Sequence, residues 1–191
     1  MSRIVVSEFI SLDGVMEDPG GGEGTTHGGW AFLADRGPEG DSFKFDELLA
    51  ADAHLLGRVT YEGFAAAWPT MEGTGEFGER MNKIPKYVVS STLTDADATW
   101  TDTTVIRDDV VAEISRLKEA PGGDLLVQGS GQLAHTLMQH GLVDELHLMV
   151  FPLILGDGKR LFPDTDDMVR LTLGDAKPLR GGVLLLTYRP A

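Results

Sequence analysis

Short runs of β-branched and aliphatic residues alternate along the chain with stretches that carry apolar residues three or four positions apart. The short runs predict buried strands at residues 4–6, 54–56, 87–89, 104–106 and 125–127. The helical stripes fall at residues 45–49, 110–117 and 133–138. Strands that alternate with helices in this way predict a mostly parallel sheet with helices on both faces.

The last third of the chain has a different pattern. Strands are expected at residues 145–151, 171–173 and 183–188, and no helical stripe separates them. We therefore expect antiparallel strands at one edge, which makes the sheet a mixed one. The stretches at residues 19–29 and 70–78 are expected as surface loops, so residues 1–191 are interpreted as a single α/β domain.

Composition narrows the range of partners. Asp and Glu number 30 against 16 Lys and Arg, which gives a formal net charge of -14. A surface this negative repels phosphates, so neither nucleic acid nor an anionic membrane is expected as a partner. The chain has 0 cysteines, which excludes disulfides, thiolate zinc sites and iron–sulfur clusters and suits a cytoplasmic protein.

Metal sites and membrane spans are not expected either. His135 and His140 lie five positions apart on a predicted helix, which is the wrong interval for two ligands on one face. The acidic residues Asp164, Asp166 and Asp167 are interpreted as part of a solvated loop. The longest apolar run, at 148–155, contains a proline and falls short of the ~18 residues that a span requires.

The candidate chemistry lies where predicted strands run into helices through glycines. Gly57, Arg58 and Thr60 follow one strand, and Gly129, Ser130, Gly131 and Gln132 follow another. Free N–H groups at a helix start attract anions, glycine lets a phosphate approach the backbone, and Arg58 could clamp it. The alternative is two tight turns with a solvated arginine. Ser90 and Ser91 follow a third strand, where their hydroxyls suit either a phosphate or ordinary turn capping.

Five motifs in register resemble the dihydrofolate reductase-like superfamily. They are Ser11-Leu12-Asp13-Gly14, Leu56-Gly57-Arg58-Val59-Thr60-Tyr61-Glu62, Gly129-Ser130-Gly131, Val143-Asp144-Glu145-Leu146 and the segment at 152–162. The last of these is similar to the branch that contains the reductase domain of bacterial riboflavin biosynthesis (the RibD C-terminal domain) and its stand-alone bacterial relatives. The resemblance covers residues 3–188, nearly the whole chain.

This resemblance implies a three-layer α/β/α fold that binds NADPH along the carboxyl edge of its sheet. By position, Gly57, Arg58 and Thr60 would contact the cofactor phosphates, and Asp13 and Gly14 would flank the nicotinamide. Ser90 and Ser91 would lie near the 2′-phosphate, and Gly129, Ser130, Gly131 and Gln132 near the pyrophosphate. The expected activity is hydride transfer to a small pterin-, pyrimidine- or flavin-precursor-like substrate, as in dihydrofolate reductases or in the reductase that acts on 5-amino-6-(5-phosphoribosylamino)uracil.

Members of this superfamily also suggest a homodimer formed through the C-terminal strands. The alternative function is a non-catalytic, dimeric nucleotide- or small-ligand-binding protein of the same fold. One departure concerns the pyrophosphate turn, where dihydrofolate reductases have a Gly-Gly pair and this chain has Ser130 between Gly129 and Gly131.

The proton donor has two candidates. Asp41 lies seventeen positions before Arg58, the interval at which dihydrofolate reductases carry an acidic residue. Asp41 beside Ser42 also suits the N-cap of the helix at 45–49, and Asp13 before Gly14 also suits a turn. Trp30 and Phe32 end the glycine-rich loop, where they would either stack on a flat substrate or pin the loop to the core.

Overall fold

The structure is a computed structural model that describes residues 1–164 and 168–191, so Asp166 and Asp167, with the solvated loop expected there, lie outside the described residues. The strands are β1 (Ile4–Ser11), β2 (Ala51–Gly57), β3 (Lys86–Val89), β4 (Thr103–Ile106), β5 (Asp124–Gln128), β6 (Glu145–Phe151), β7 (Leu171–Pro178) and β8 (Leu184–Pro190). The helices are α1 (Gly37–Ala50), α2 (Arg58–Ala67), α3 (Gly75–Lys83), α4 (Val110–Glu119) and α5 (Gly131–Gln139), with short 3-10 turns η1 (Trp30–Leu33) and η2 (Arg180–Gly182).

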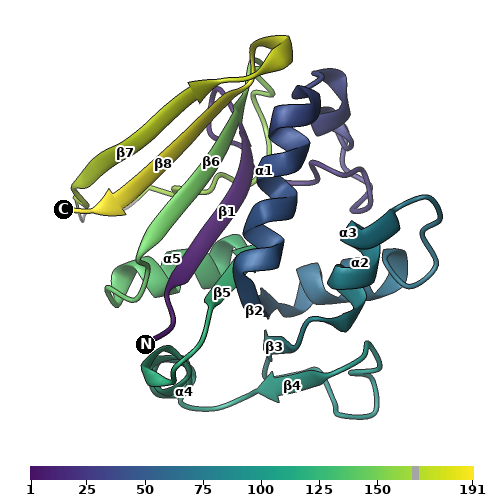
Figure 1. Cartoon of the computed structure of the whole chain (residues 1–191), viewed down its shortest axis with the longest axis vertical. Coiled ribbons are helices and arrows are strands. Elements are labelled where there is room, and N and C mark those ends of the chain that lie inside the picture. Colours follow the sequence, from purple (N-terminus) through teal and green to yellow (C-terminus); the bar gives the residue numbers. More distant parts are fainter. Residues whose placement is uncertain (165–167) are drawn as a thin grey trace.

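These strands form one sheet in the order β4-β3-β2-β5-β1-β6-β8-β7 (Figure 1). Strand β1 lies in the middle and runs parallel to both neighbours, β5 and β6. Strand β8 is antiparallel to β6, and β7 is antiparallel to β8. The expected mixed sheet, mostly parallel with antiparallel C-terminal strands, is therefore confirmed.

Helices cover both faces of the sheet because successive strand residues point in opposite directions. On β1, Ile4 and Val6 join a buried cluster with Ile114 of α4 and Leu137 of α5. The residue between them, Val5, joins a second cluster with Leu48 of α1. In Figure 1, α1 lies in front of the sheet and α5 behind it, which is the three-layer arrangement.

The start of α1 differs from the sequence prediction. The helix begins at Gly37, with Arg36 as its N-cap and Pro38 in the first turn. Proline at this point fixes φ at a helical value and has no N–H to leave unpaired, so the helix starts before Asp41. The prediction that Asp41 and Ser42 cap this helix was therefore wrong. Part of the loop expected at 70–78 is also helical, because Phe77 and Met81 on α3 pack against the second cluster.

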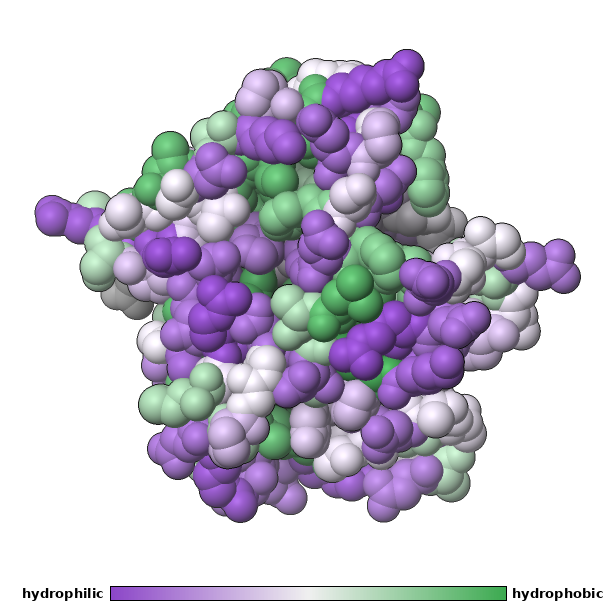
Figure 2. Space-filling view, viewed as in Figure 1, coloured by the Kyte–Doolittle hydropathy of each residue, from purple (hydrophilic) through white to green (hydrophobic). Residues whose placement is uncertain are grey.

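The face of the molecule drawn in Figure 2 is mostly hydrophilic, with hydrophobic side chains gathered in small groups along its middle. Within the described residues, no helix combines the length and apolar character needed to cross a membrane.

Candidate functional site

Two helices start side by side at the carboxyl edge of the sheet. Strand β2 ends at Gly57 and leads directly into α2, while its neighbour β5 leads through Gly129 and Ser130 into α5. The N–H of Gly57 donates a hydrogen bond to Ser130 Oγ at 2.8 Å. Ser130 Oγ in turn donates to Thr60 Oγ1 at 3.0 Å. The structure thus brings Gly57, Thr60, Gly129 and Ser130, which the sequence predicted as site residues, into one cluster.

The turn between β5 and α5 has an unusual backbone. Gly129 and Ser130 are both left-handed, with φ of 61° and 63°. A Cβ atom on Gly129 would lie 2.8 Å from the side chain of Thr60, and one on Gly131 would lie 2.7 Å from Met16 Sδ. The positive φ and the contact with Thr60 together require glycine at position 129, whereas a side chain at position 131 would have to displace the flexible end of Met16. Ser130 adopts a conformation that glycine tolerates best, and its hydroxyl offsets the strain by bonding to β2 and α2.

This cluster has the electrostatics of an anion site. Neither α2 nor α5 has a side-chain capping hydrogen bond from its N-cap residue, Gly57 or Ser130, among the residues that the structure describes. The first N–H groups of both helices therefore remain available, and both helix dipoles direct their positive ends to this edge. Arg58 is exposed at the start of α2 and forms an ion pair with Glu62 at 2.8 Å on the same helix.

The hydroxyls after β3 divide into two roles. Ser90 is buried, and its Oγ accepts hydrogen bonds from the N–H groups of Thr92 and Leu93 at 3.1 and 2.9 Å. Ser90 therefore caps the turn, as one of the two interpretations of the sequence expected. Ser91 is exposed, so its hydroxyl faces solvent and is accessible to a ligand. Arg107, at the end of β4, pairs with Asp95 at 2.7 Å.

Lys86 is a buried cation at the other end of the sheet. It is the first residue of β3, and its Nζ donates to the carbonyls of Asn82 and Thr101 and lies 4.2 Å from the centre of the Trp100 ring. Burial lowers the pKa of Lys86 to about 8. A hollow of about 550 Å³ beside Asn82, Trp100 and Thr101 belongs to this opposite end as well, so it is not part of the glycine cluster.

Asp13 joins two loops at the ends of β1 and β6. It accepts hydrogen bonds from Ser11 Oγ at 2.6 Å and from the N–H groups of Leu155 and Gly156 at 3.1 and 2.8 Å. The hydrogen bond from Ser11, followed in size by the one from Gly156, lowers the pKa of Asp13 to about 2. Asp13 is thus an ionised anchor, poorly suited to donating a proton. Gly14 beside it has a φ of 84°, which is the turn that the Asp-Gly pair indicated.

Asp41 is exposed on the outer side of α1. Its carboxylate forms an ion pair with Arg36 at 2.8 Å, and 65% of its side chain is accessible to solvent. This carboxyl therefore faces solvent and its ion-pair partner, and it is not enclosed in a pocket where it could meet a buried substrate.

Trp30 and Phe32 on the turn η1 have different environments. Trp30 is buried, its ring packs edge-on against Phe151 at 5.4 Å, and its Nε1 donates to the carbonyl of Glu17 at 2.7 Å. Trp30 therefore pins the glycine-rich loop to the core and is not available to a substrate. Phe32 is 78% exposed and remains available.

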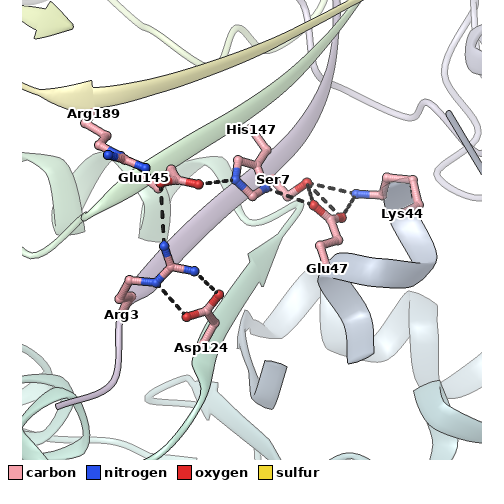
Figure 3. A network of polar contacts seen from close by, with 8 residues as sticks. All are labelled: Arg3, Ser7, Lys44, Glu47, Asp124, Glu145, His147 and Arg189. Atoms are coloured by element: carbon pink, nitrogen blue, oxygen red, sulfur yellow. Dashed lines mark hydrogen bonds and ion pairs between the residues drawn. The ribbon is translucent and has the colours of Figure 1, made fainter. Parts of the chain in front are cut away.

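A buried polar network between α1 and the middle of the sheet was missed by the sequence prediction (Figure 3). Lys44 and Glu47 of α1 form an ion pair above Ser7 of β1. Lys44 Nζ donates to Ser7 Oγ at 2.9 Å, and Ser7 Oγ bonds to both carboxylate oxygens of Glu47 at 2.9 and 2.7 Å. His147 of β6 bridges Glu47 and Glu145, at 3.1 Å through Nδ1 and 2.7 Å through Nε2.

Mutual pairing sets the charges in this network. Burial alone would raise the pKa of Glu47, but Lys44, His147 and Ser7 outweigh it and lower the pKa to about 2. Burial would lower the pKa of His147, but hydrogen bonds to Glu47 and Glu145 outweigh it and raise the pKa. Arg189 extends the network to the surface through Glu145 at 2.9 Å. The i, i+3 spacing of Lys44 and Glu47 was visible in the sequence, but their partners depend on strand register.

The chain has relatives among known proteins over nearly its full length. The family model of the RibD C-terminal domain matches residues 2–185. The chain belongs to the RibD C-terminal domain family. It is 28% identical over 189 residues to the uncharacterized protein YyaP of Bacillus subtilis, covering 97% of this chain and 94% of YyaP.

Solved structures show the same fold. A putative riboflavin biosynthesis protein from Shewanella sp. PV-4 superposes with a TM-score of 0.78 at 19% identity, covering 100% of this chain and 99% of that one. The dihydrofolate reductase from Enterococcus faecalis, complexed with NADP(H), superposes with a TM-score of 0.57 at 18% identity, covering 98% and 96%. The dihydrofolate reductase-like fold and its RibD C-terminal branch are therefore confirmed, and family membership supports a reductase-type role.

Proposed function

We propose that this protein is an NADPH-dependent reductase that transfers a hydride to a small pterin-, pyrimidine- or flavin-precursor-like substrate. The observation that carries the proposal is the convergence of two uncapped helix starts on one turn, held by the bonds from Gly57 to Ser130 and from Ser130 to Thr60. Such a turn offers several N–H groups and two positive dipole ends to one anionic group.

The residues at this edge fit a dinucleotide pyrophosphate. Gly129 and Gly131 carry no side chain, so a phosphate would meet bare backbone between α2 and α5. Gln132 is exposed in the first turn of α5, where its amide could reach the same group. Arg58 is the exposed cation of the site, and Ser91 is the exposed hydroxyl that a 2′-phosphate could contact.

The cofactor would supply the hydride, and the chain would supply binding and alignment. Gly14 and the loop anchored by Asp13 lie at the ends of β1 and β6, the place that family position gives to the nicotinamide ring. Phe32 is the aromatic group that remains available to stack on a flat substrate. The proposal gives the proton to neither Asp13 nor Asp41, because the first is held ionised and the second is paired outside on α1.

A homodimer is part of the proposal. Strand β7 is exposed along its whole length at the edge of the sheet. Leu173 on β7 lies opposite Tyr188 of β8, and Leu184 points to the same face of the sheet. These leucines are 51% and 36% exposed, so they offer an apolar surface to a second copy of the chain.

The test is a titration of the purified protein with NADPH and with NADH, followed by cofactor fluorescence. We expect NADPH to bind, and we expect Arg58→Ala to weaken NADPH about tenfold more than NADH, as for the loss of one charge-assisted contact to the extra phosphate. No binding at millimolar cofactor would overturn the reductase proposal. Binding of NADPH without turnover of any pterin, pyrimidine or flavin precursor would favour the alternative, a non-catalytic dimeric ligand-binding protein.

A further inference from the structure

Glu8 is a buried carboxyl directly beneath the Gly129 turn. It lies on β1, and its Oε2 accepts a hydrogen bond from the N–H of Gly129 at 3.0 Å. Its other oxygen, Oε1, is buried and has no hydrogen-bond partner among the residues that the structure describes. A buried polar atom without a partner is costly, and far more so when the group is charged. The geometry therefore favours the neutral, protonated carboxyl.

The surroundings of Glu8 support this state. Burial raises the pKa of Glu8 well above its ordinary value, and Lys44 and the Gly129 N–H lower it by less. The charged groups that act on Glu8 are Lys44 and Glu47 of α1, and they form an ion pair with each other. Strand β5 contributes the N–H of Gly129, and the register neighbour on β6 is the apolar Leu148. Lys44 is thus already neutralised and does not compensate a second carboxylate fully.

We propose that Glu8 is a positioning residue for the anion site: as a neutral acid it holds the Gly129 N–H from below, and by ionising it weakens phosphate binding at the turn. The inference rests on the proposed function, because the anion at this turn is the cofactor pyrophosphate. A neutral acceptor orients the turn without adding negative charge beneath the phosphates. An ionised Glu8 would place a buried like charge on the far side of one backbone turn, where water screens it little.

Linkage makes the effect reciprocal. If ionised Glu8 weakens the binding of NADPH, then bound NADPH must raise the affinity of Glu8 for its proton by the same factor. At a pH where Glu8 is ionised in the free protein, the protein should therefore take up a proton when NADPH binds. A carboxyl with a purely structural role would not couple to the ligand in this way.

The experiment measures the Kd of NADPH between about pH 7 and about pH 10 in the wild type, Glu8→Gln, Glu8→Ala and Asp144→Asn. The 2′-phosphate is already largely ionised at the lower limit, so its titration contributes little. Asp144 is the matched control: its carboxylate also accepts a backbone N–H, that of Ile4 at 2.8 Å, but at the amino end of the sheet. Isothermal titration of the wild type in two buffers of different ionisation enthalpy, at about pH 9, measures the proton uptake.

We expect the wild-type and Asp144→Asn affinities to fall by roughly tenfold or more across this range, as for a like charge near the bound phosphates. Glu8→Gln keeps a neutral acceptor, so its affinity should match the wild type near pH 7 and vary much less with pH. Glu8→Ala loses the bond to Gly129, so it should bind several-fold more weakly at every pH.

Two results would overturn this inference while leaving the proposed function intact. One is a wild-type Kd for NADPH that does not change with pH, together with no proton uptake on binding. The other is a pH dependence that survives unchanged in Glu8→Gln. Failure of the wild type to bind NADPH at any pH would instead overturn the proposed function, and the role of Glu8 with it. The proton-uptake measurement on the wild type decides the matter if Glu8→Gln does not fold.

Discussion

Ser130 Oγ lies 2.8 Å from the backbone nitrogen of Gly57, so one hydroxyl joins the ends of two neighbouring strands. The same oxygen lies 3.0 Å from Thr60 Oγ1 in the first turn of α2. Ser130 therefore fixes the start of α2 relative to the start of α5. If the two helix starts bind one anion together, this hydroxyl holds the distance between them.

Two substitutions of Ser130 separate the contribution of its hydroxyl to stability from the cost of its left-handed backbone. Ser130→Ala removes both hydrogen bonds and leaves the N–H of Gly57 without its acceptor, so we expect a loss of about 1–3 kcal/mol of unfolding free energy. Ser130→Gly removes the same bonds but relieves the strain of φ at 63°, so it should be about 1 kcal/mol more stable than Ser130→Ala. Urea unfolding of both variants measures this. Equal stabilities would show that the left-handed conformation carries no strain.

The pair of Arg58 with Glu62 predicts a variant with tighter cofactor binding. Glu62→Gln releases Arg58 from its 2.8 Å ion pair, and an exposed pair of this kind is worth about 0–1 kcal/mol. We therefore expect the Kd of NADPH to fall by up to about fivefold, with a smaller change for NADH.

The matched control for this prediction is Glu79→Gln, which breaks an equivalent i, i+4 pair with Lys83 on α3. Cofactor fluorescence titrations compare the two variants. A weaker affinity for NADPH in Glu62→Gln would contradict this prediction, since it would mean that the ion pair holds Arg58 in its binding position and does not compete with the cofactor for it.

The topology and the glycine cluster were predictable because each depends on local signals. The short β-branched runs and the glycines at 57, 129 and 131 mark strand ends directly. Parallel strands bring such ends to one edge, so the association of Gly57 with Ser130 followed from the fold class.

The environments of single side chains were not predictable in this way. Trp30 and Phe32 are two positions apart in sequence, yet one is buried against Phe151 and the other is 78% exposed. Asp41 fits the spacing of a proton donor, but Pro38 starts the helix earlier and Asp41 pairs with Arg36 on the outer side of α1. The bonds among Ser7, Glu47 and His147 require the register of β1 with β6, which no local pattern gives.

The contrast between Trp30 and Phe32 gives a paired prediction. Trp30→Ala empties a buried ring position, so we expect a loss of about 3–5 kcal/mol of unfolding free energy. Phe32→Ala should change stability by less than about 0.5 kcal/mol, because the ring is largely in solvent. If Phe32 stacks on the substrate, Phe32→Ala should raise KM with little effect on the NADPH Kd. Unchanged KM with a substrate that the wild type reduces would remove Phe32 from the substrate site.

The exposed leucines of the C-terminal strands predict the assembly state. Leu173→Glu places a charge on an apolar surface that a second copy would bury. The dimer dissociation constant of this variant should therefore be one to two orders of magnitude higher than that of the wild type. Light scattering coupled to gel filtration measures the mass across protein concentrations. Val59→Glu is the matched control, since Val59 is 57% exposed but lies on α2. A monomeric wild type would exclude the dimer at these strands.

The buried network of Figure 3 has a defined pH range in which its own contribution to stability is greatest. The folded-state pKa of His147 is raised by Glu47 and Glu145, so its contribution is full below its unfolded pKa of about 6.5 and disappears as pH rises through the folded value. The pKa of Glu47 is lowered to about 2, so its contribution is full above about 4.5 and disappears as pH falls toward 2. The stability that His147 and Glu47 contribute should therefore be greatest between about pH 4.5 and 6.5.

Variants of His147 and Glu47 separate the contributions of these two residues to stability. His147→Asn keeps a hydrogen-bonding side chain but cannot protonate, so the fall in stability above pH 6.5 should flatten, whereas His140→Asn at the exposed end of α5 should leave it unchanged. Glu47→Ala leaves Lys44 buried without its partner, for which we expect a loss of about 3–5 kcal/mol at pH 6. Urea unfolding across the pH range measures all three. A stability that rises through pH 6.5 to 8 in the wild type would contradict the raised pKa, because the folded protein would then bind fewer protons than the unfolded chain.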